Sequence, residues 1–322
     1  MRLPLVALCL ALFLVRAPSA NASDLSKFKR VVVFGDSLSD NGNSLVLLNG
    51  VPPPPYYNGR WSNGPNWVDY FPLVAHHFPT VAAYFPDPKN ANGTNLAVYG
   101  SISSNLIESE PTGLPAQIPI YLTSTGEQAF ADDLYVIWIG ANDFRAGISP
   151  SKTVENIRDG IIQLWEAGAR SFAVINLPDI SLTPAVIASG TAVVQAAKQF
   201  VYTVNALLYA EILSYAWSHG IRIELVDINF IFTQVVCNPG KFGFANSTGA
   251  AFNPNLPLSS SNPVPDPNDY VFWDGFHPTT KAHYIAAQFI YRTLTSRRVF
   301  PEPVPVPLAR LDFSKRLVSP LK

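Results

Sequence analysis

The fold of this chain is decided by the stretch Val31-Val32-Val33-Phe34-Gly35-Asp36-Ser37-Leu38-Ser39-Asp40. Three valines and a phenylalanine form a short apolar run, which is typical of a strand buried on both faces of a parallel sheet. The run ends at Gly35, so Ser37 is expected just beyond the carboxyl end of a strand, where open α/β sheets bind their ligands. On this stretch alone, Ser37 is equally well interpreted as a nucleophile or as the N-cap of the next segment.

Four further runs of the same character predict strands at residues 94–100, 133–140, 171–177 and 221–228. Apolar residues recur at helical spacing between them, as in 154–164 and 193–207. Strands that alternate with helices predict the α/β class, here a three-layer α/β/α fold around a central, mainly parallel five-stranded sheet.

Three other segments carry weaker signals. Residues 66–78 are expected to form a short helix that Pro72 kinks or breaks, and residues 279–294 a last helix. The segment 239–269 is rich in Pro, Asn, Ser and Gly, so we expect a long irregular loop there.

The chain has 322 residues, 48% of them hydrophobic, and a formal net charge of −1. Nucleic-acid binding would need a clustered basic excess, so no nucleic-acid partner is expected. We find no internal boundary and expect a signal peptide at 1–20, a single domain at 21–300 and a Pro-rich tail at 301–322.

The first residues have the composition of a secretory signal. Arg2 precedes an apolar run at 3–15, and small residues surround Ala20. The run is too short to span a bilayer and no other run is long enough, so we expect no integral membrane segment. The sequence therefore predicts a secreted, extracellular protein.

The expected secretion bears on the two cysteines and on two asparagines. Cleavage would remove Cys9 and leave Cys237 alone, so no internal disulfide can form and Cys237 is expected to be a buried structural thiol. The patterns that begin at Asn92 and Asn246 match the acceptor for N-glycosylation.

The second decisive stretch is Trp273-Asp274-Gly275-Phe276-His277-Pro278. An aspartate and a histidine three residues apart can hydrogen-bond within one turn. The carboxylate then orients the imidazole and stabilises its protonated form, so that the imidazole can take a proton from a serine hydroxyl. No spacing typical of metal ligands is present, and we expect no metal and no cofactor.

Four separated sequence blocks follow one another along the chain in a recognisable order. They are Gly35-Asp36-Ser37-Leu38, Ala97-Val98-Tyr99-Gly100, Gly140-Ala141-Asn142-Asp143 and Asp274-Gly275-Phe276-His277-Pro278. With them, the chain resembles the secreted members of the GDSL esterase/lipase family in the SGNH hydrolase superfamily. Residues 59–65 also resemble the segment that follows the serine in many of these members. The resemblance implies the flavodoxin-like fold of that superfamily.

The resemblance also implies roles for individual residues. Ser37 would attack an ester carbonyl, His277 would act as general base and then acid, and Asp274 would orient His277. The oxyanion hole would consist of the backbone N–H groups of Ser37 and Gly100 with the side-chain amide of Asn142.

The substrate is less constrained. Trp61 lies in an aromatic and proline-rich loop that could form a wall of the cleft, and Tyr99 stands where many family members have a small residue, so both are expected to contact substrate. The sequence favours a serine carboxylic-ester hydrolase acting on short acyl or acetyl esters, such as acetylated carbohydrate. A lipase or phospholipase acting on lipid esters is the alternative, and a carbohydrate-binding module without catalysis is a more distant one.

Overall fold

The computed structural model describes residues 25–76, 78–86, 93–105, 112–259 and 261–295. The expected signal peptide, the expected tail and the acceptor Asn92 lie outside these residues.

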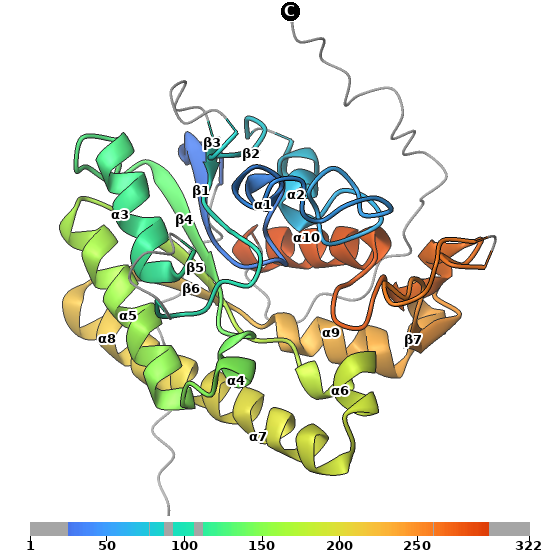
Figure 1. Ribbon diagram of the computed structural model, residues 1–322. Helices are drawn as coiled ribbons and strands as arrows, with labels where there is room; N and C mark the ends of the chain where they lie inside the picture. Colours follow the sequence, from blue (N-terminus) through green and yellow to red (C-terminus); the bar gives the residue numbers. More distant parts are fainter. Residues whose placement is uncertain (1–24, 77, 87–92, 106–111, 260, 296–322) are drawn as a thin grey trace, which may run out of the picture.

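A parallel sheet forms the centre of the molecule (Figure 1). Its order is β2-β3-β1-β4-β5-β6. The bounds are β1 Arg30–Gly35, β2 Ala82–Ala83, β3 Gly93–Asn95, β4 Asp133–Trp138, β5 Ser171–Ile175 and β6 Arg222–Val226. The fold class is as predicted, but the expected count of five strands is wrong. The additional strand, β2, has two residues at the edge of the sheet, too few to show any hydrophobic periodicity.

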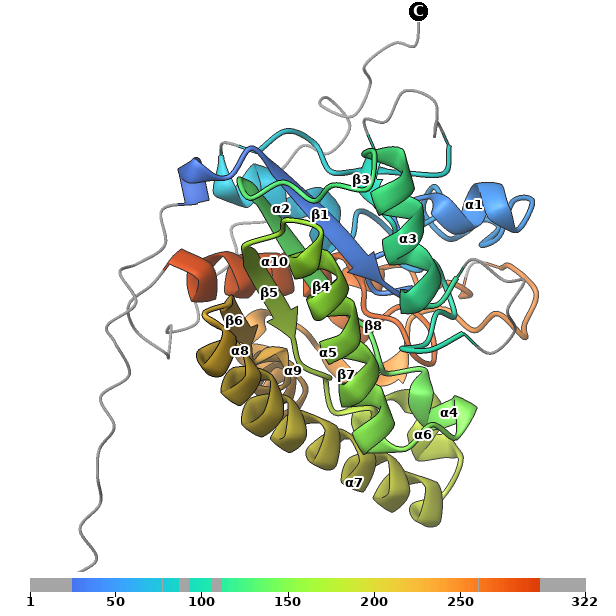
Figure 2. The same ribbon diagram turned by 90° about the vertical axis from the view of Figure 1, so that its left-hand side faces the viewer.

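Helices cover both faces of the sheet, as Figures 1 and 2 show. One face packs against α3 (Leu114–Ser124), α5 (Pro150–Glu166), α7 (Thr191–Leu207) and α8 (Leu213–His219), and the other against α2 (Trp67–Ala75), α9 (Ile228–Cys237) and α10 (Thr280–Thr295). Strand β1 shows why both faces of the sheet are covered by helices. Val32 and Phe34 enter the first core and Val31 and Val33 the second, because neighbouring side chains of a strand point to opposite faces.

Local capping signals set the helix starts. Asn66 forms a capping box with Asp69 at the start of α2, and Ser149 caps α5 in front of Pro150. Of the kink or break expected at Pro72, the break does not occur, because α2 continues through this residue to Ala75. A π-helix, η3 (Leu208–Ile212), joins α7 to α8 without interruption.

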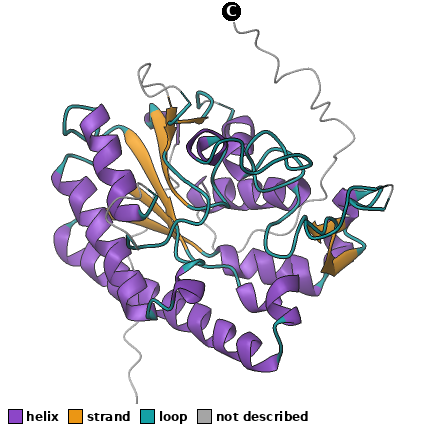
Figure 3. Cartoon of the chain, viewed as in Figure 1, coloured by secondary structure: helices purple, strands orange, loops and turns teal. Residues whose placement is uncertain are grey.

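Two other expectations are wrong. The segment 239–269 is not wholly irregular, because β7 (Asn246–Ala250) lies in it and pairs in parallel with β8 (Tyr270–Phe272) outside the main sheet (Figure 3). Cys237, the last residue of α9, is exposed, although Val235 in the same turn is buried. Within the described ranges, no helix combines the length and apolarity that crossing a membrane requires.

Candidate active site

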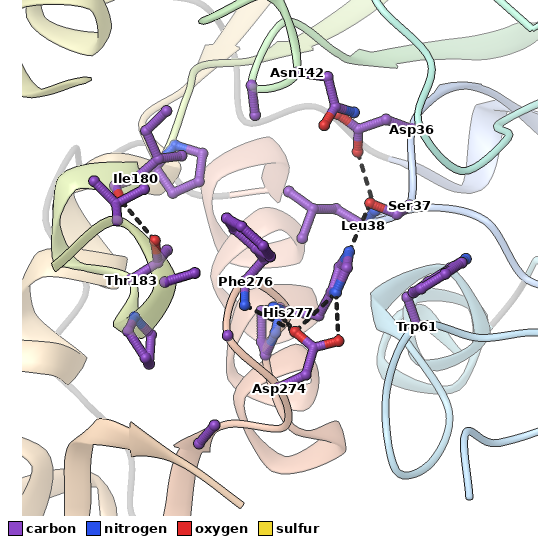
Figure 4. Close-up of a pocket in the computed structure, with 18 of the residues that line it drawn as sticks. Asp36, Ser37, Leu38, Trp61, Asn142, Ile180, Thr183, Asp274, Phe276 and His277 are labelled. Carbon is purple, nitrogen blue, oxygen red and sulfur yellow. Dashed lines mark hydrogen bonds and ion pairs between the residues drawn. The ribbon is translucent and has the colours of Figure 1, made fainter. Parts of the chain in front are cut away.

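Three side chains from the two ends of the domain form a hydrogen-bonded chain (Figure 4). Ser37 follows β1, while Asp274 and His277 lie in the turn between β8 and α10. Nε2 of His277 lies 3.0 Å from Oγ of Ser37, and its Nδ1 lies 2.8 Å from Oδ2 of Asp274. All three side chains are buried. This arrangement can transfer the serine proton to the imidazole.

The carboxylate of Asp274 is held in its ionised form. Its Oδ1 accepts the backbone N–H groups of Phe276 and His277, each at 2.8 Å. Burial opposes ionisation, but the charge of His277 and these hydrogen bonds outweigh it, so the pKa of Asp274 lies below its ordinary value. An ionised Asp274 can stabilise the imidazolium that forms when His277 takes up a proton.

The three residues expected to form the oxyanion hole, Ser37, Gly100 and Asn142, line the same cavity. Gly100 has φ +76°, a backbone conformation that favours glycine, although a Cβ there would meet open space. Asn142 precedes the short helix α4 (Asp143–Ala146), and its amide donates to the carbonyl of Ser101 at 3.0 Å. That bond uses one amide hydrogen and ties Asn142 to the residue after Gly100, leaving a second amide hydrogen for a substrate.

Buried aspartates fix the loops that carry these groups. Oδ2 of Asp40 accepts the backbone N–H of Tyr99 at 3.0 Å and the hydroxyl of Ser44. Asp143 accepts the backbone N–H of Ser103 at 2.8 Å and also bonds the Ser103 hydroxyl. Burial raises the pKa of both carboxyls against these hydrogen bonds. The Gly100 loop is therefore held from two sides.

Asp36 adjoins Ser37 and lines the same cavity. Its Oδ1 accepts the N–H of Leu38 at 3.0 Å. Burial raises the pKa of Asp36 to about 7, against the hydrogen bond from Leu38. Its charge therefore changes within the neutral pH range.

Trp61 and Tyr99 lie together beside His277. Their rings stack with centroids 3.6 Å apart, and the Trp61 ring lies 5.2 Å from the imidazole. Both line the cavity, where they can contact a bound substrate.

The cavity extends well beyond the reacting atoms. Its volume is about 1110 Å³. Apolar side chains of the 3-10 helix η2 (Ile180–Leu182), of α6 (Pro184–Ala188) and of α9 also line it, among them Ile180, Val186, Ile231, Phe232 and Val235. Such a lining suits an apolar chain better than a polar one.

Sequence reasoning missed Tyr56, Gln117 and Asp40. The hydroxyl of Tyr56 donates to Oδ2 of Asp274 at 2.7 Å. The carboxamide of Gln117 bonds both backbone groups of Gly35, with its Oε1 2.9 Å from N and its Nε2 2.8 Å from O. For Tyr56 and Asp40 the only sequence signal is proximity to blocks of the family motif; Gln117 has none.

The remaining acceptor for glycosylation, Asn246, is half-buried in β7. Its Oδ1 accepts the N–H groups of Thr248 and Gly249. In the part of the chain that the structure describes, no cluster of three or more His, Cys, Asp or Glu side chains could hold a metal ion.

Comparisons with known proteins identify the family of this chain. A family model for GDSL-like lipase/acylhydrolase matches residues 31–290. Phosphatidylcholine-sterol acyltransferase of Aeromonas hydrophila is 30% identical over 306 residues, covering 80% of this chain and 87% of that protein. Esterase EstA of Pseudomonas aeruginosa is 31% identical over 340 residues, covering 91% of this chain and 50% of that protein.

Among solved structures, an acetylxylan esterase from Geobacillus stearothermophilus superposes with a TM-score of 0.46 at 13% identity, over 83% of this chain and 94% of that one. The family match spans all four blocks, from the strand before Ser37 to the helix after His277. The chain therefore belongs to the GDSL-like lipase/acylhydrolase family of carboxylic ester hydrolases.

Proposed function

We propose that the protein is a secreted serine esterase in which Ser37, His277 and Asp274 form the catalytic triad. The observation that carries the proposal is the hydrogen-bonded chain from Ser37 Oγ through His277 to Asp274. The base lies within hydrogen-bond distance of both the nucleophile and the orienting group, which is the geometric requirement for an activated serine.

The reaction follows from these positions. His277 takes the hydroxyl proton of Ser37 as Oγ bonds to the ester carbonyl carbon, and the carbonyl oxygen gains negative charge. The backbone N–H groups of Ser37 and Gly100 and the amide of Asn142 stabilise that charge. His277 then gives its proton to the leaving alcohol as the ester C–O bond breaks. A water molecule releases the acyl group from Ser37 by the same steps.

The cavity also bears on the preferred length of the acyl group. The sequence favours short acyl or acetyl esters, with lipid esters as the alternative. The volume and apolar lining of the cavity support the alternative, because an acetyl group would fill little of about 1110 Å³. The similarity to a phosphatidylcholine-sterol acyltransferase also supports it. We therefore propose that esters of longer acyl chains are the preferred substrates.

Secretion is part of the same proposal. It is supported by the basic, apolar and small residues within 1–20, and N-linked glycans at Asn92 and Asn246 would follow in a eukaryotic secretory pathway. Mass spectrometry of protein recovered from the culture medium tests both points, because it reports the mature N-terminus and the glycan mass.

The test of the reaction is hydrolysis of p-nitrophenyl esters from acetyl to palmitoyl by the wild type and by Ser37→Ala. We expect kcat/KM to rise with chain length and the variant to lose activity by a factor of roughly 10⁴ or more. Wild-type rates in Ser37→Ala would refute the serine mechanism. Activity confined to acetyl and butyryl esters would instead establish the short-chain preference.

A further inference from the structure

The hydroxyl of Tyr56 reaches the carboxylate that orients the base. Its Oη lies 2.7 Å from Oδ2 of Asp274, the oxygen that also lies 2.8 Å from Nδ1 of His277. The ionised carboxylate can only accept, so Tyr56 donates. Burial and the charge of Asp274 raise the pKa of Tyr56 far above its ordinary value, so the hydroxyl keeps its proton at any pH used for an assay.

The hydrogen bonds of Asp274 are divided between its two oxygens. Oδ1 accepts the backbone N–H groups of Phe276 and His277. Oδ2 has Tyr56 and the imidazole as its partners, and among the described residues Tyr56 is the one side chain other than His277 that bonds this carboxylate. Tyr56 therefore limits rotation of the carboxylate on the side where the imidazole binds.

The ring of Tyr56 is itself fixed by aromatic packing. It meets Phe252 and Trp273 edge to face, with centroids 5.6 and 6.1 Å away, and lies tilted against Trp61 at 5.2 Å. These contacts do not involve the hydroxyl, so they position Tyr56 independently of Asp274.

The loop that carries Tyr56 is also tied to the segment that follows His277. Ser62 Oγ donates to the carbonyl of Pro278 at 2.9 Å, and the N–H of Thr280 donates to Oδ1 of Asn63 at 2.8 Å. Segments more than 200 residues apart in sequence thus form one rigid unit around the base.

We propose that Tyr56 is a positioning residue, which acts through Asp274 to hold the ring of His277 toward Ser37. The inference rests on the proposed catalytic triad and adds a fourth member to it. Its hydroxyl also withdraws negative charge from Oδ2, so a carboxylate without this bond would stabilise the imidazolium more strongly. Loss of the hydroxyl should therefore impair alignment and also make the base harder to deprotonate.

Tyr56→Phe tests the proposal, because it removes only the hydroxyl and keeps the ring. With a p-nitrophenyl ester, we expect kcat to fall about 10-fold, as for one hydrogen bond to a charged group, with KM changed less than about 2-fold. The acidic limb of the profile of kcat/KM against pH should move upward by about half a pH unit. The substitution leaves Asp36 and His283, two other titratable groups that interact with His277, untouched, while Asp274 loses one hydrogen bond.

Tyr57→Phe is the matched control. Tyr57 lies in the same loop, and no hydrogen bond of its hydroxyl to another described residue is seen, so this variant should keep the wild-type kcat and pH profile. Thermal unfolding of both variants shows whether either change merely loosens the fold. An unchanged kcat and unchanged acidic limb in Tyr56→Phe would overturn the proposal.

A double-mutant cycle tests the route through Asp274. In an Asp274→Ala background, Tyr56→Phe should cause less than about a 2-fold further loss, because the partner of the hydroxyl is gone. A full 10-fold loss in that background would show that Tyr56 acts elsewhere and would overturn the proposal. Ser37→Ala distinguishes failure of the proposed triad from failure of the role proposed for Tyr56. If Ser37→Ala is inactive while Tyr56→Phe keeps wild-type activity, the serine mechanism stands and the role of Tyr56 is refuted.

Discussion

Replacement of Gln117 by leucine should test how the strand that carries the nucleophile is anchored. Gln117 is completely buried, and its carboxamide accepts from the N–H of Gly35 and donates to the carbonyls of Gly35 and Thr112. Leucine has nearly the same volume, so the change removes hydrogen bonds without leaving a large cavity.

The expected loss of stability depends on which hydrogen bonds each backbone group keeps in the variant. The carbonyl of Gly35 also accepts the N–H of Val98, and that of Thr112 also accepts the hydroxyl of Ser101, so each loses one of two partners. Each such loss costs about 0.5–1.5 kcal/mol, and a Gly35 N–H left without a partner costs about 1–3 kcal/mol. Together these changes should lower the free energy of unfolding by about 2–6 kcal/mol.

Urea unfolding at pH 7, followed by tryptophan fluorescence, measures this change, because Trp67, Trp138 and Trp273 are buried. Gln163→Leu is the control, since Gln163 is exposed on α5 and its replacement should change stability by less than about 0.5 kcal/mol. A cost for Gln117→Leu no larger than that of the control would refute the reasoning, because the Gly35 N–H would then have another partner.

Three further variants test other parts of the structure. Asn142→Ala should lower kcat for a p-nitrophenyl ester about 10²–10³-fold without unfolding the protein, because one oxyanion donor is lost; an unchanged kcat would exclude Asn142 from that role. The free energy of unfolding of Asp36→Asn, measured in urea, should rise relative to that of the wild type by about 3 kcal/mol between pH 5 and pH 9. The reason is that burial raises the pKa of Asp36 to about 7, so stability from this group is present at acid pH and is lost as pH rises through 7; parallel pH profiles for the two proteins would contradict it. Arg30→Met should cost about 1.5–3 kcal/mol in the same assay at neutral pH, because the bidentate partner of the nearly inaccessible Asp133 carboxylate is removed from a part-buried pair. The double variant with Asp133→Asn should recover part of the loss, and no recovery would argue against an unpaired charge as the cause.

The sheet was predictable where strands are long and fully buried. Strand β1 and strand β4 each show an unbroken apolar run, because both faces of the sheet are covered. The edge strand β2 and the pair β7 and β8 were not predictable, because they have only two to five residues, and β2 and β7 consist of small and polar types whose pairing depends on tertiary contacts.

The same contrast applies to the site. Ser37, Asp274 and His277 could be proposed from sequence because each stands in a short block with a recognisable chemical purpose, and the structure brings them within hydrogen-bond distance. Tyr56 and Gln117 could not, because a tyrosine in a proline-rich loop and a glutamine in a helix have no local pattern that reveals their partners. Their bonds to Asp274 and Gly35 span 218 and 82 residues.

The distance in sequence between the proposed nucleophile and its proposed base has a consequence for biosynthesis. Ser37 and His277 are 240 residues apart, and His277 is held next to the first turn of α10, which packs on α2. A ribosome completes the serine strand long before it completes the base, so a growing chain carries an ordinary alcohol rather than an activated one. With the proposed triad, ester cleavage can begin only after the last helix has docked, and the appearance of activity would then report the completion of folding.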